Sequence, residues 1–478
     1  MKKNLNILFV AAEVAPFSKA GGLADVAGAL PGALKHLDCN TTIMTPLYGF
    51  MDKKSLNLSR PEYSTEITFA DEPNRADYYF VMHNGIDILF LENESFYQRD
   101  GIYTDSNGQG YEDNFGRFLF LQKAALAVLE KRLIVPDVVH VNDHHTALLP
   151  WMMKNRRLGI PSLLTIHNSM YQGEFSTDDV LLLDEREQIK LSETKQTLNS
   201  LDIGLHHADA VNTVSKTYRE ELLEKPELSY GLYKTYIHIS ERFHGILNGA
   251  DYAIWNPETD PKIKKNYSIN SIKDKQQNKL DLFKQVGLPA APSAPLIGSV
   301  SRQVASKGFF LILDCINELI NLDCRFVFLG TGDNDIMSEL QQAKGKYPNH
   351  IAVVSDYNEP LSHQIEAGAD IFIMPSEVEP CGLNQIYSLK YGTIPVVHRT
   401  GGLADTVIPW EGKKGNGFVF SDYSKKALLS AMKEAINAYK SDSWDTIITN
   451  AMNADFSWNR SAKQYKSLYN TIINVVDA

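Results

Sequence analysis

The stretch that most constrains the fold of this chain is Pro375–Gly392, which reads PSEVEPCGLNQIYSLKYG. The apolar run Ala369–Met374 before it predicts a buried parallel strand, and Leu383–Tyr391 predicts a helix. A turn from strand to helix aims backbone N–H groups and the positive end of a helix dipole at one point, which suits a phosphate. Glu379 precedes that point, where a carboxylate suits the hydroxyl groups of an attached sugar. The alternative is a solvated loop around a buried Cys381.

The N-terminal region shows the same order of a predicted strand, a turn and a helix. Asn6–Ala12 predicts a strand, and Lys19, Gly21 and Gly22 follow it before a helix-like stretch. Two glycines allow a ligand to approach the backbone closely, and a lysine supplies a point charge to a diphosphate. Asp25 falls in the first turn of the helix, where it either complements the helix dipole or accepts hydrogen bonds from a sugar.

Polar residues follow further predicted strands. Asp143 comes just after the strand Pro136–Val141, and His167 comes directly after the strand Ser162–Ile166. In open α/β sheets, ligands bind outside the carboxyl ends of the strands. We therefore expect Asp143 and His167 to lie in a ligand site.

The chain is organised as two series of strand and helix units. A turn-rich segment, Leu247–Pro261, separates them, and the second series contains a strand, Pro295–Val300, followed by Arg302 and Lys307. GGLADV begins at Gly21, and GGLADTV begins at residue 401, each after a predicted strand. This pattern predicts two Rossmann-like halves that face each other across a cleft, where ligands commonly bind.

The region 92–114, ENESFYQRDGIYTDSNGQGYEDN, lacks an apolar pattern and predicts a long loop. Long ordered loops are often binding elements. Exposed tyrosines there would suit sugar stacking, although the segment could equally be a variable surface loop.

Composition excludes several classes of protein. A length of 478 residues predicts two or three domains, and a formal charge of −11 argues against a general nucleic-acid binder. The four cysteines form no CxxC pair, and Asp143, His144 and His145 lack the further ligands of a standard metal site. No run approaches the roughly 18 apolar residues of a membrane span, and Glu13 interrupts the first apolar run too early for a signal peptide. We expect a cytoplasmic protein without a cofactor.

The predicted site suits the release of a diphosphate. Lys19, Arg302 and Lys307 supply three cations, enough to neutralise a diphosphate without a metal. No pair of carboxylates has a spacing that supports a glycosidase, and the absence of GxGxxG disfavours an NAD-dependent dehydrogenase.

Several long motifs resemble the bacterial glycogen synthases and plant starch synthases. They are LFVAAEVAPFSKAGGLADV, TIHN, LNGAD, SRQVASKG and EPCGLNQIYSLKYGTIPVVHRTGGLADTV, and the resemblance covers nearly the whole chain. It implies the α/β GT-B fold, with two Rossmann-like domains across a deep cleft. The implied domains are an acceptor-side domain at 1–250, a nucleotide-sugar domain at 251–455 and, at 456–478, a helix that crosses back to the first domain. The implied activity is the retaining transfer of glucose, with ADP-glucose the favoured donor, to the non-reducing end of an α-1,4-glucan.

The resemblance also implies roles for individual residues. The implied catalytic residues are Glu379, His167, Asp143, Arg302 and Lys307. The implied donor-binding residues are Lys19, Gly21, Gly22, Asn248, Arg302, Lys307, Tyr357, Glu379, Cys381, Gly382 and Leu383. The implied acceptor-binding residues are Asp25 and Asn168, and no metal ligand is implied.

The sequence departs from the family at His144, where many relatives have Trp. Many retaining enzymes of this fold have a second Glu eight residues after the first; here that position is Tyr387, as in the glycogen synthases, which favours this narrower resemblance. Two alternatives remain open: a retaining transferase of the same fold with a small-sugar acceptor, and a non-catalytic glucan-binding relative. The sequence does not indicate an oligomeric state.

Overall fold

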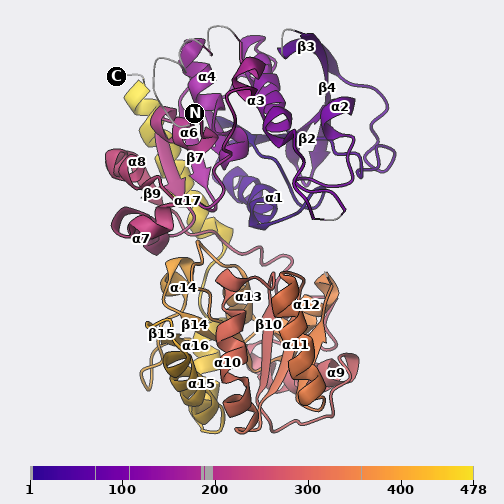
Figure 1. The fold of residues 1–478 in the computed structure, drawn as a ribbon, viewed down its shortest axis with the longest axis vertical. Coiled ribbons are helices and arrows are strands. Elements are labelled where there is room, and N and C mark those ends of the chain that lie inside the picture. The colour runs from indigo at the N-terminus through magenta and orange to yellow at the C-terminus, as the bar shows by residue number, and fades with distance from the viewer. Residues whose placement is uncertain are drawn as a thin grey trace. The chain divides into compact units, whose positions relative to one another are not determined.

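The computed structural model describes residues 4–69, 72–106, 108–184, 188, 198–356 and 358–476. The chain forms two compact units, which are described separately: unit 1 comprises Met1–Gly249 with Trp458–Ala478, and unit 2 comprises Ala250–Ser457. Figure 1 shows the α/β architecture of each unit, with helices packed around a sheet. The expected fold class of two parallel-sheet domains is confirmed.

Unit 1 is built on a sheet that contains nine strands among the described residues, in the order β3-β4-β5-β2-β1-β6-β7-β8-β9. The pairs from β5 to β9 are parallel, while β3, β4 and β5 pair antiparallel. Every residue of β6 and β7 is buried, as expected for parallel strands covered on both faces. The strands are β1 (Leu5–Val10), β2 (Cys39–Pro46), β3 (Tyr63–Phe69), β4 (Glu72–His83), β5 (Ile86–Glu92), β6 (Val138–Asn142), β7 (Ser162–Ile166), β8 (Ala210–Thr213) and β9 (Phe243–Gly245).

The helices of unit 1 connect these strands. They are α1 (Gly22–Lys35), α2 (Glu94–Tyr97), α3 (Asn114–Glu130), α4 (Leu149–Asn155), α6 (Ser200–His207), α7 (Lys216–Glu224), α8 (Tyr233–His238) and α17 (Trp458–Val476). Short 3-10 turns occur at η1 (His144–Thr146), η2 (Asp179–Leu182), η3 (Pro226–Ser229) and η4 (Ser240–Arg242).

Helix α17 belongs to unit 1 although it follows the whole of unit 2 in the chain. In Figure 1 this yellow helix lies with the indigo and magenta elements of unit 1. Its buried residues Leu468 and Ile472 join the apolar core that contains Phe9 of β1 and Leu30 of α1. Burial of one such aliphatic side chain contributes about 1.5–3 kcal/mol, so the core of unit 1 depends on this helix.

A buried chain of hydrogen bonds also joins α17 to the sheet. The Tyr469 hydroxyl lies 2.8 Å from His140 Nδ1, and His140 Nε2 lies 2.7 Å from Thr165 Oγ1. Thr165 donates to Asn212 Oδ1, and Asn212 Nδ2 donates to the Tyr465 hydroxyl. Because Thr165 uses its only proton on Asn212, it accepts from His140 Nε2–H, and His140 Nδ1 therefore accepts from Tyr469. Each group in this chain has a partner, as buried polar groups require.

Unit 2 is a parallel sheet whose described strands follow the order β12-β11-β10-β13-β14-β15. Its strands are β10 (Leu296–Val300), β11 (Arg325–Leu329), β12 (Ile351–Val354), β13 (Ile371–Met374), β14 (Ile394–His398) and β15 (Phe418–Phe420). Its helices are α9 (Lys275–Gln285), α10 (Phe309–Ile320), α11 (Asn334–Lys346), α12 (Glu359–Gly368), α13 (Asn384–Lys390), α14 (Gly401–Thr406), α15 (Lys425–Tyr439) and α16 (Trp444–Met452), with 3-10 turns η5 (Ile269–Asp274) and η6 (Ala305–Lys307). The strand predicted before Glu379 and the helix predicted after it are confirmed as β13 and α13.

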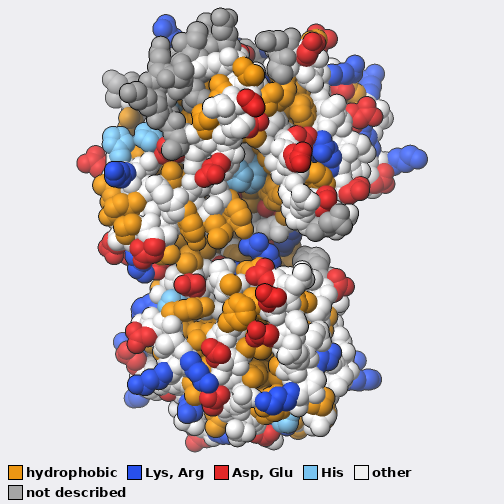
Figure 2. Space-filling model, in the orientation of Figure 1, with side chains coloured by type: hydrophobic (Ala, Val, Ile, Leu, Met, Phe, Trp, Pro, Cys, Tyr) orange, Lys and Arg blue, Asp and Glu red, His pale blue; other side chains and the backbone are white. Residues whose placement is uncertain are grey.

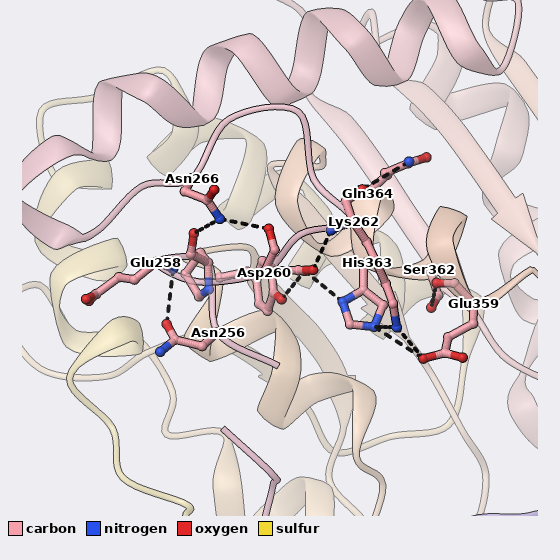
Figure 3. A network of polar contacts seen from close by, with 11 residues as sticks. Asn256, Glu258, Asp260, Lys262, Asn266, Glu359, Ser362, His363 and Gln364 are labelled. Carbon is pink, nitrogen blue, oxygen red and sulfur yellow. Dashed lines mark hydrogen bonds and ion pairs between the residues drawn. The ribbon is translucent and has the colours of Figure 1, made fainter. Parts of the chain in front are cut away.

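The first segment of unit 2 is fixed to α12 by a polar network (Figure 3). His363 of α12 is fully buried; its Nδ1 lies 2.7 Å from Asp260 Oδ2 and its Nε2 lies 3.3 Å from Lys262 Nζ. Lys262 also pairs with Glu359 at the start of α12. The Trp255 ring stacks on His363, with ring centroids 3.7 Å apart. The segment that leads out of unit 1 is therefore an integral part of unit 2.

On the face shown in Figure 2, acidic and basic side chains are interspersed over each unit. None of the helices in the described part of the chain combines the length and apolar character needed to cross a membrane. All four cysteines are buried, and no disulfide joins any two of them.

Candidate functional site

In unit 2, the candidate residues lie where the strand order reverses. The chain runs outward from β10 to β12 and then returns to place β13 beside β10. Lys307 follows β10, Glu379 follows β13, and Lys307 Nζ lies 2.5 Å from Glu379 Oε2. The carboxyl ends at such a reversal are the usual ligand site of an open α/β sheet. The structure thus brings together two predicted residues that are 72 positions apart in the chain.

Two side chains, Lys307 and Ser376, hold the carboxylate of Glu379 in place. Ser376 is fully buried and its hydroxyl donates to the same Glu379 Oε2 at 3.0 Å. The side chain of Glu379 is 7% exposed and that of Lys307 is 19% exposed. Ion pairs held in such surroundings have defined geometry, because neither side chain is free to rotate into water. Ser376 was not predicted, although its position three residues before Glu379 in a turn was visible in the sequence.

Glycines shape the main chain around this pair. A Cβ on Gly401, which has φ +40°, would lie 2.0 Å from the carbonyl oxygen of Glu379. The N–H of Gly402 donates to that same carbonyl at 3.1 Å. A Cβ on Gly308, with φ +79°, would lie 2.1 Å from the carbonyl of Pro375. The second GGLAD motif, which begins at Gly401, therefore packs directly against the loop that contains Glu379. A side chain at Gly401 has no room there.

Two further groups of unit 2 are available to an anion. Arg302 is exposed, and no described residue forms a hydrogen bond or ion pair with its guanidinium. In the described part of the chain, the N–H groups of Gly382 and Leu383 also have no partner. Cys381 is buried, and its carbonyl accepts from Gln385 of α13 at 3.0 Å. Guanidinium and backbone N–H groups are the usual partners of phosphate.

In unit 1, the glycine turn after β1 is occupied by a carboxylate that sequence reasoning did not assign to the site. Glu13 is buried, and its Oε2 accepts the N–H of Ala20 and, at 3.0 Å, that of Gly21. Lys19 pairs with Asp25 at 2.6 Å across the start of α1. Burial raises the pKa of Glu13, although its hydrogen bonds act in the opposite direction. Glu13 thus orders the turn that carries Lys19, and Gly22 begins α1.

Asp143 and His167 meet at the reversal of strand order in unit 1, where β6 lies beside β1. Asp143 has the left-handed φ of 54°, uncommon for a residue other than glycine, and its Oδ1 accepts the N–H of His167 at 2.7 Å. Burial, opposed by this N–H and reinforced by the charge of Glu13, raises the pKa of Asp143 to about 7. Burial also lowers the pKa of His167 to about 3, so its imidazole is neutral near pH 7.

The loop predicted at 92–114 is largely packed into unit 1. Helix α2 lies within it, and Tyr97 is fully buried and donates to the Arg117 carbonyl at 2.9 Å. Tyr103 interacts with Glu13, which opposes the rise in the pKa of that carboxyl group, and its ring stacks on His145, with ring centroids 4.8 Å apart. The expected exposure of the tyrosines is therefore wrong for Tyr97, because the loop folds back onto α3.

The remaining predicted site residues differ from one another in burial and in their hydrogen-bond partners. Asn248 is 5% exposed, and its Oδ1 has no hydrogen-bond partner among the described residues. Asn168 Oδ1 accepts the N–H of Met170 in a local turn at 3.0 Å. His144 packs against Gly173, where a Cβ would lie 2.6 Å from its ring, and burial lowers the pKa of His144 to about 4. Tyr357 lies outside the described residues.

Comparisons with known proteins agree on one family. Residues 6–238 match the family described as starch synthase catalytic domain, and residues 283–451 match glycosyl transferases group 1. The glycogen synthase of Anaeromyxobacter sp. (strain Fw109-5) is 39% identical over 98% of this chain and 99% of its own length. The glycogen synthase of Streptococcus mutans is 36% identical over 97% of this chain and 99% of its own length.

Two solved structures share the fold of this chain, and one of them is also similar in sequence. The catalytic domain of starch synthase IV from Arabidopsis thaliana, bound to ADP and acarbose, superposes with a TM-score of 0.89 and 31% identity over 98% of this chain and 100% of that one. A sucrose-phosphate synthase from Thermosynechococcus elongatus superposes with a TM-score of 0.60 at 17% identity over 98% of this chain and 100% of that one, which shows a shared fold alone.

Proposed function

This chain belongs to the family of glycogen synthases and starch synthases, and we propose that it transfers glucose from ADP-glucose to the non-reducing end of an α-1,4-glucan with retention of configuration. The relative that superposes at 0.89 was solved with ADP and acarbose, a nucleotide and a glucan-like sugar. The proposed location is the cytoplasm, where nucleotide sugars are available to a glucan.

The observation that carries the proposal is the Lys307–Glu379 pair at the strand reversal of unit 2. When the bond between glucose C1 and the diphosphate oxygen breaks, negative charge grows on the diphosphate. Lys307 and Arg302 are the proposed partners of that charge, together with the N–H groups of Gly382 and Leu383. Charged groups fixed before the reaction stabilise such a transition state at no cost of reorganisation.

Glu379 is assigned an electrostatic and sugar-binding role. Its Oε2 is engaged by both Lys307 and Ser376, which leaves the other carboxylate oxygen for glucose hydroxyls. The acceptor hydroxyl attacks C1 on the face from which the diphosphate departs, and its proton passes to a departing phosphate oxygen. This route retains the configuration without a covalent intermediate on the protein.

Unit 1 supplies further proposed contacts with the donor and the acceptor. His167 is assigned to the glucose 6-hydroxyl and Asn168 to the acceptor. Lys19 is the cation assigned to the donor, and its pairing with Asp25 means that the donor phosphate competes with a carboxylate for it. Among the described residues, no group of three or more His, Cys, Asp or Glu side chains is arranged to hold a metal ion.

The test is incorporation of labelled glucose into glycogen from ADP-glucose and from UDP-glucose in parallel, with EDTA present. Incorporation from ADP-glucose in excess of UDP-glucose is the expected result. A reversed ratio would replace the proposed donor by UDP-glucose. No incorporation from either donor by folded protein would favour a small-sugar acceptor or a non-catalytic glucan-binding relative.

The assigned residues are tested by Lys307→Ala. Loss of one preorganised charge predicts a fall in kcat of at least ~10²-fold. Lys425→Ala is the matched control, because Lys425 pairs with Glu318 in the same unit at 2.8 Å, but both side chains are at least 40% exposed. Equal kcat values for the two variants would remove Lys307 from the catalytic group.

A further inference from the structure

Asn142 is the last residue of β6, and its fully buried carboxamide has two partners. Its Nδ2 donates to the carbonyl of Val10 in the neighbouring strand β1 at 3.1 Å, and its Oδ1 lies 3.0 Å from His167 Nε2. The Val10 carbonyl fixes the orientation of the amide, because the reversed amide would place two oxygens against each other. Oδ1 therefore faces His167, and an amide oxygen only accepts hydrogen bonds. It follows that Nε2 of His167 carries a proton.

The other ring nitrogen of His167 is differently placed. Among the described residues, Nδ1 has no hydrogen-bond partner, and the side chain is half-buried rather than closed off. The titratable groups that face His167 are Asp143, which directly follows β6, His140 on β6 and His145 on η1. Burial keeps both of these histidines neutral, with the pKa of His140 lowered to about 3 and that of His145 lowered as well.

A neutral imidazole has one N–H and one lone pair. Burial lowers the pKa of His167 to about 3, so the ring stays neutral over the range in which a cytoplasmic enzyme works. With its single proton committed to Asn142, the ring presents a lone pair at Nδ1. A substrate group at that nitrogen must donate a hydrogen bond rather than accept one.

We propose that Asn142 is a positioning residue that fixes the Nε2–H tautomer of His167, so that Nδ1 accepts a hydrogen bond from a sugar hydroxyl and disfavours a sugar carboxylate. This inference rests on the proposed function, because it takes His167 to lie at the 6-position of the donor glucose. Through His167, Asn142 thus contributes to selectivity for a nucleotide-linked glucose over the corresponding glucuronic acid. The 6-carboxylate of glucuronic acid only accepts hydrogen bonds, so it cannot donate one to Nδ1. Asn142 itself does not contact the sugar.

The first test observes the tautomer directly and requires no activity. Full-length protein labelled with ¹⁵N at histidine, with His167→Gln as the assignment control, is observed by long-range ¹H–¹⁵N correlation at pH 7.5. The expected spectrum shows a protonated Nε2 and an unprotonated Nδ1 for His167. A protonated Nδ1 overturns the inference, whether or not the protein transfers glucose.

The second test replaces Asn142 by aspartate and compares pH profiles of kcat/KM with ADP-glucose. A carboxylate beside Nε2 favours the imidazolium, and an adjacent opposite charge raises a pKa by about 1–3 units. In Asn142→Asp, the acid limb of the profile should therefore move to higher pH by at least about one unit. Asn278→Asp is the matched control, because Asn278 is also buried and bonded to main chain, in unit 2.

Equal profiles for the two variants would overturn the inference, as would an Asn142→Asp protein whose neutral His167 ring carries its single proton on Nδ1 rather than on Nε2. If the wild-type protein transfers no glucose from either nucleotide sugar, the proposed function fails while the tautomer measurement still decides the role of Asn142. Should Asn142→Asp fail to fold, the wild-type spectrum alone decides the inference.

Discussion

Replacing Tyr469 by phenylalanine removes one oxygen atom from the interface between α17 and the sheet. The aromatic ring and its apolar contacts remain in place. The hydroxyl donates to His140 Nδ1 at 2.8 Å, and both side chains are fully buried. The substitution therefore leaves a buried acceptor without a partner, in a region that water does not reach.

The expected cost follows from that unmet acceptor. A buried polar group that loses its partner costs about 1–3 kcal/mol, more than the hydrogen bond itself contributes on balance. The structure places this site no lower than the middle of the range, because Thr165 holds His140 Nε2 at 2.7 Å and prevents the ring from turning to a new partner. We expect about 2 kcal/mol, which corresponds to a fall in the Tm of unit 1 of about 4–8 °C.

The measurement is calorimetry or urea unfolding of the full chain, followed through the transition of unit 1. Tyr171→Phe is the matched control, since its side chain is 47% exposed. In a His140→Gln background the cost of Tyr469→Phe should shrink, because the two groups interact directly. A loss below about 0.5 kcal/mol, equal to that of Tyr171→Phe, would refute the argument that the hydrogen bond to His140 is needed.

Three further outcomes follow from groups already described. Burial lowers the pKa of His140 to about 3, so the stabilising effect of the neutral His140 ring is complete above pH ~6.5 and is lost as the pH falls toward 3. The destabilisation caused by His140→Gln should therefore shrink by about 2–3 kcal/mol between pH 7 and pH 4.5. A destabilisation that stays constant with pH in urea unfolding would contradict this expected pH dependence. Glu13→Ala should increase the hydrogen exchange of the two turn amides that its carboxylate accepts by about 10-fold, the equivalent of one bond; unchanged exchange by mass spectrometry would show that the turn is held by other groups. Gly401→Ala should lower kcat because its Cβ would displace Glu379, whereas Gly412→Ala, with φ +74° and open space around it, should retain activity; similar kcat values would exclude the proposed steric effect.

The sequence predicted the elements that local pattern encodes. The strand before Glu379 and the helix after it were visible as an apolar run and a glycine-bounded polar turn, and they appear as β13 and α13. His167 was singled out because it directly follows an apolar run, and it does stand at the end of β7. These features depend on residues that are close together in the sequence, so hydrophobic periodicity and the positions of turn-forming residues are enough to predict them.

What the sequence did not predict depends on contacts between distant segments. In the sequence Glu13 stands out only as a break in an apolar run, yet it orders the glycine turn and lies beside Tyr103. Asn142 gained its role from the pairing of β6 with β1, which brings it to Val10. Such contacts follow from strand order, and strand order is set by packing across the whole sheet rather than by any local window.

The placement of α17 has a consequence for how the chain folds during synthesis. The strands of unit 1 are made first, but part of their apolar core is closed by a helix that follows Ser457. At the usual translation rate, about 200 residues of unit 2 take roughly 10–40 s to appear, and throughout that time unit 1 has an open face. Unit 2 is thus able to fold on the ribosome before unit 1 is complete, because the apolar core of unit 1 stays open until α17 has been synthesised.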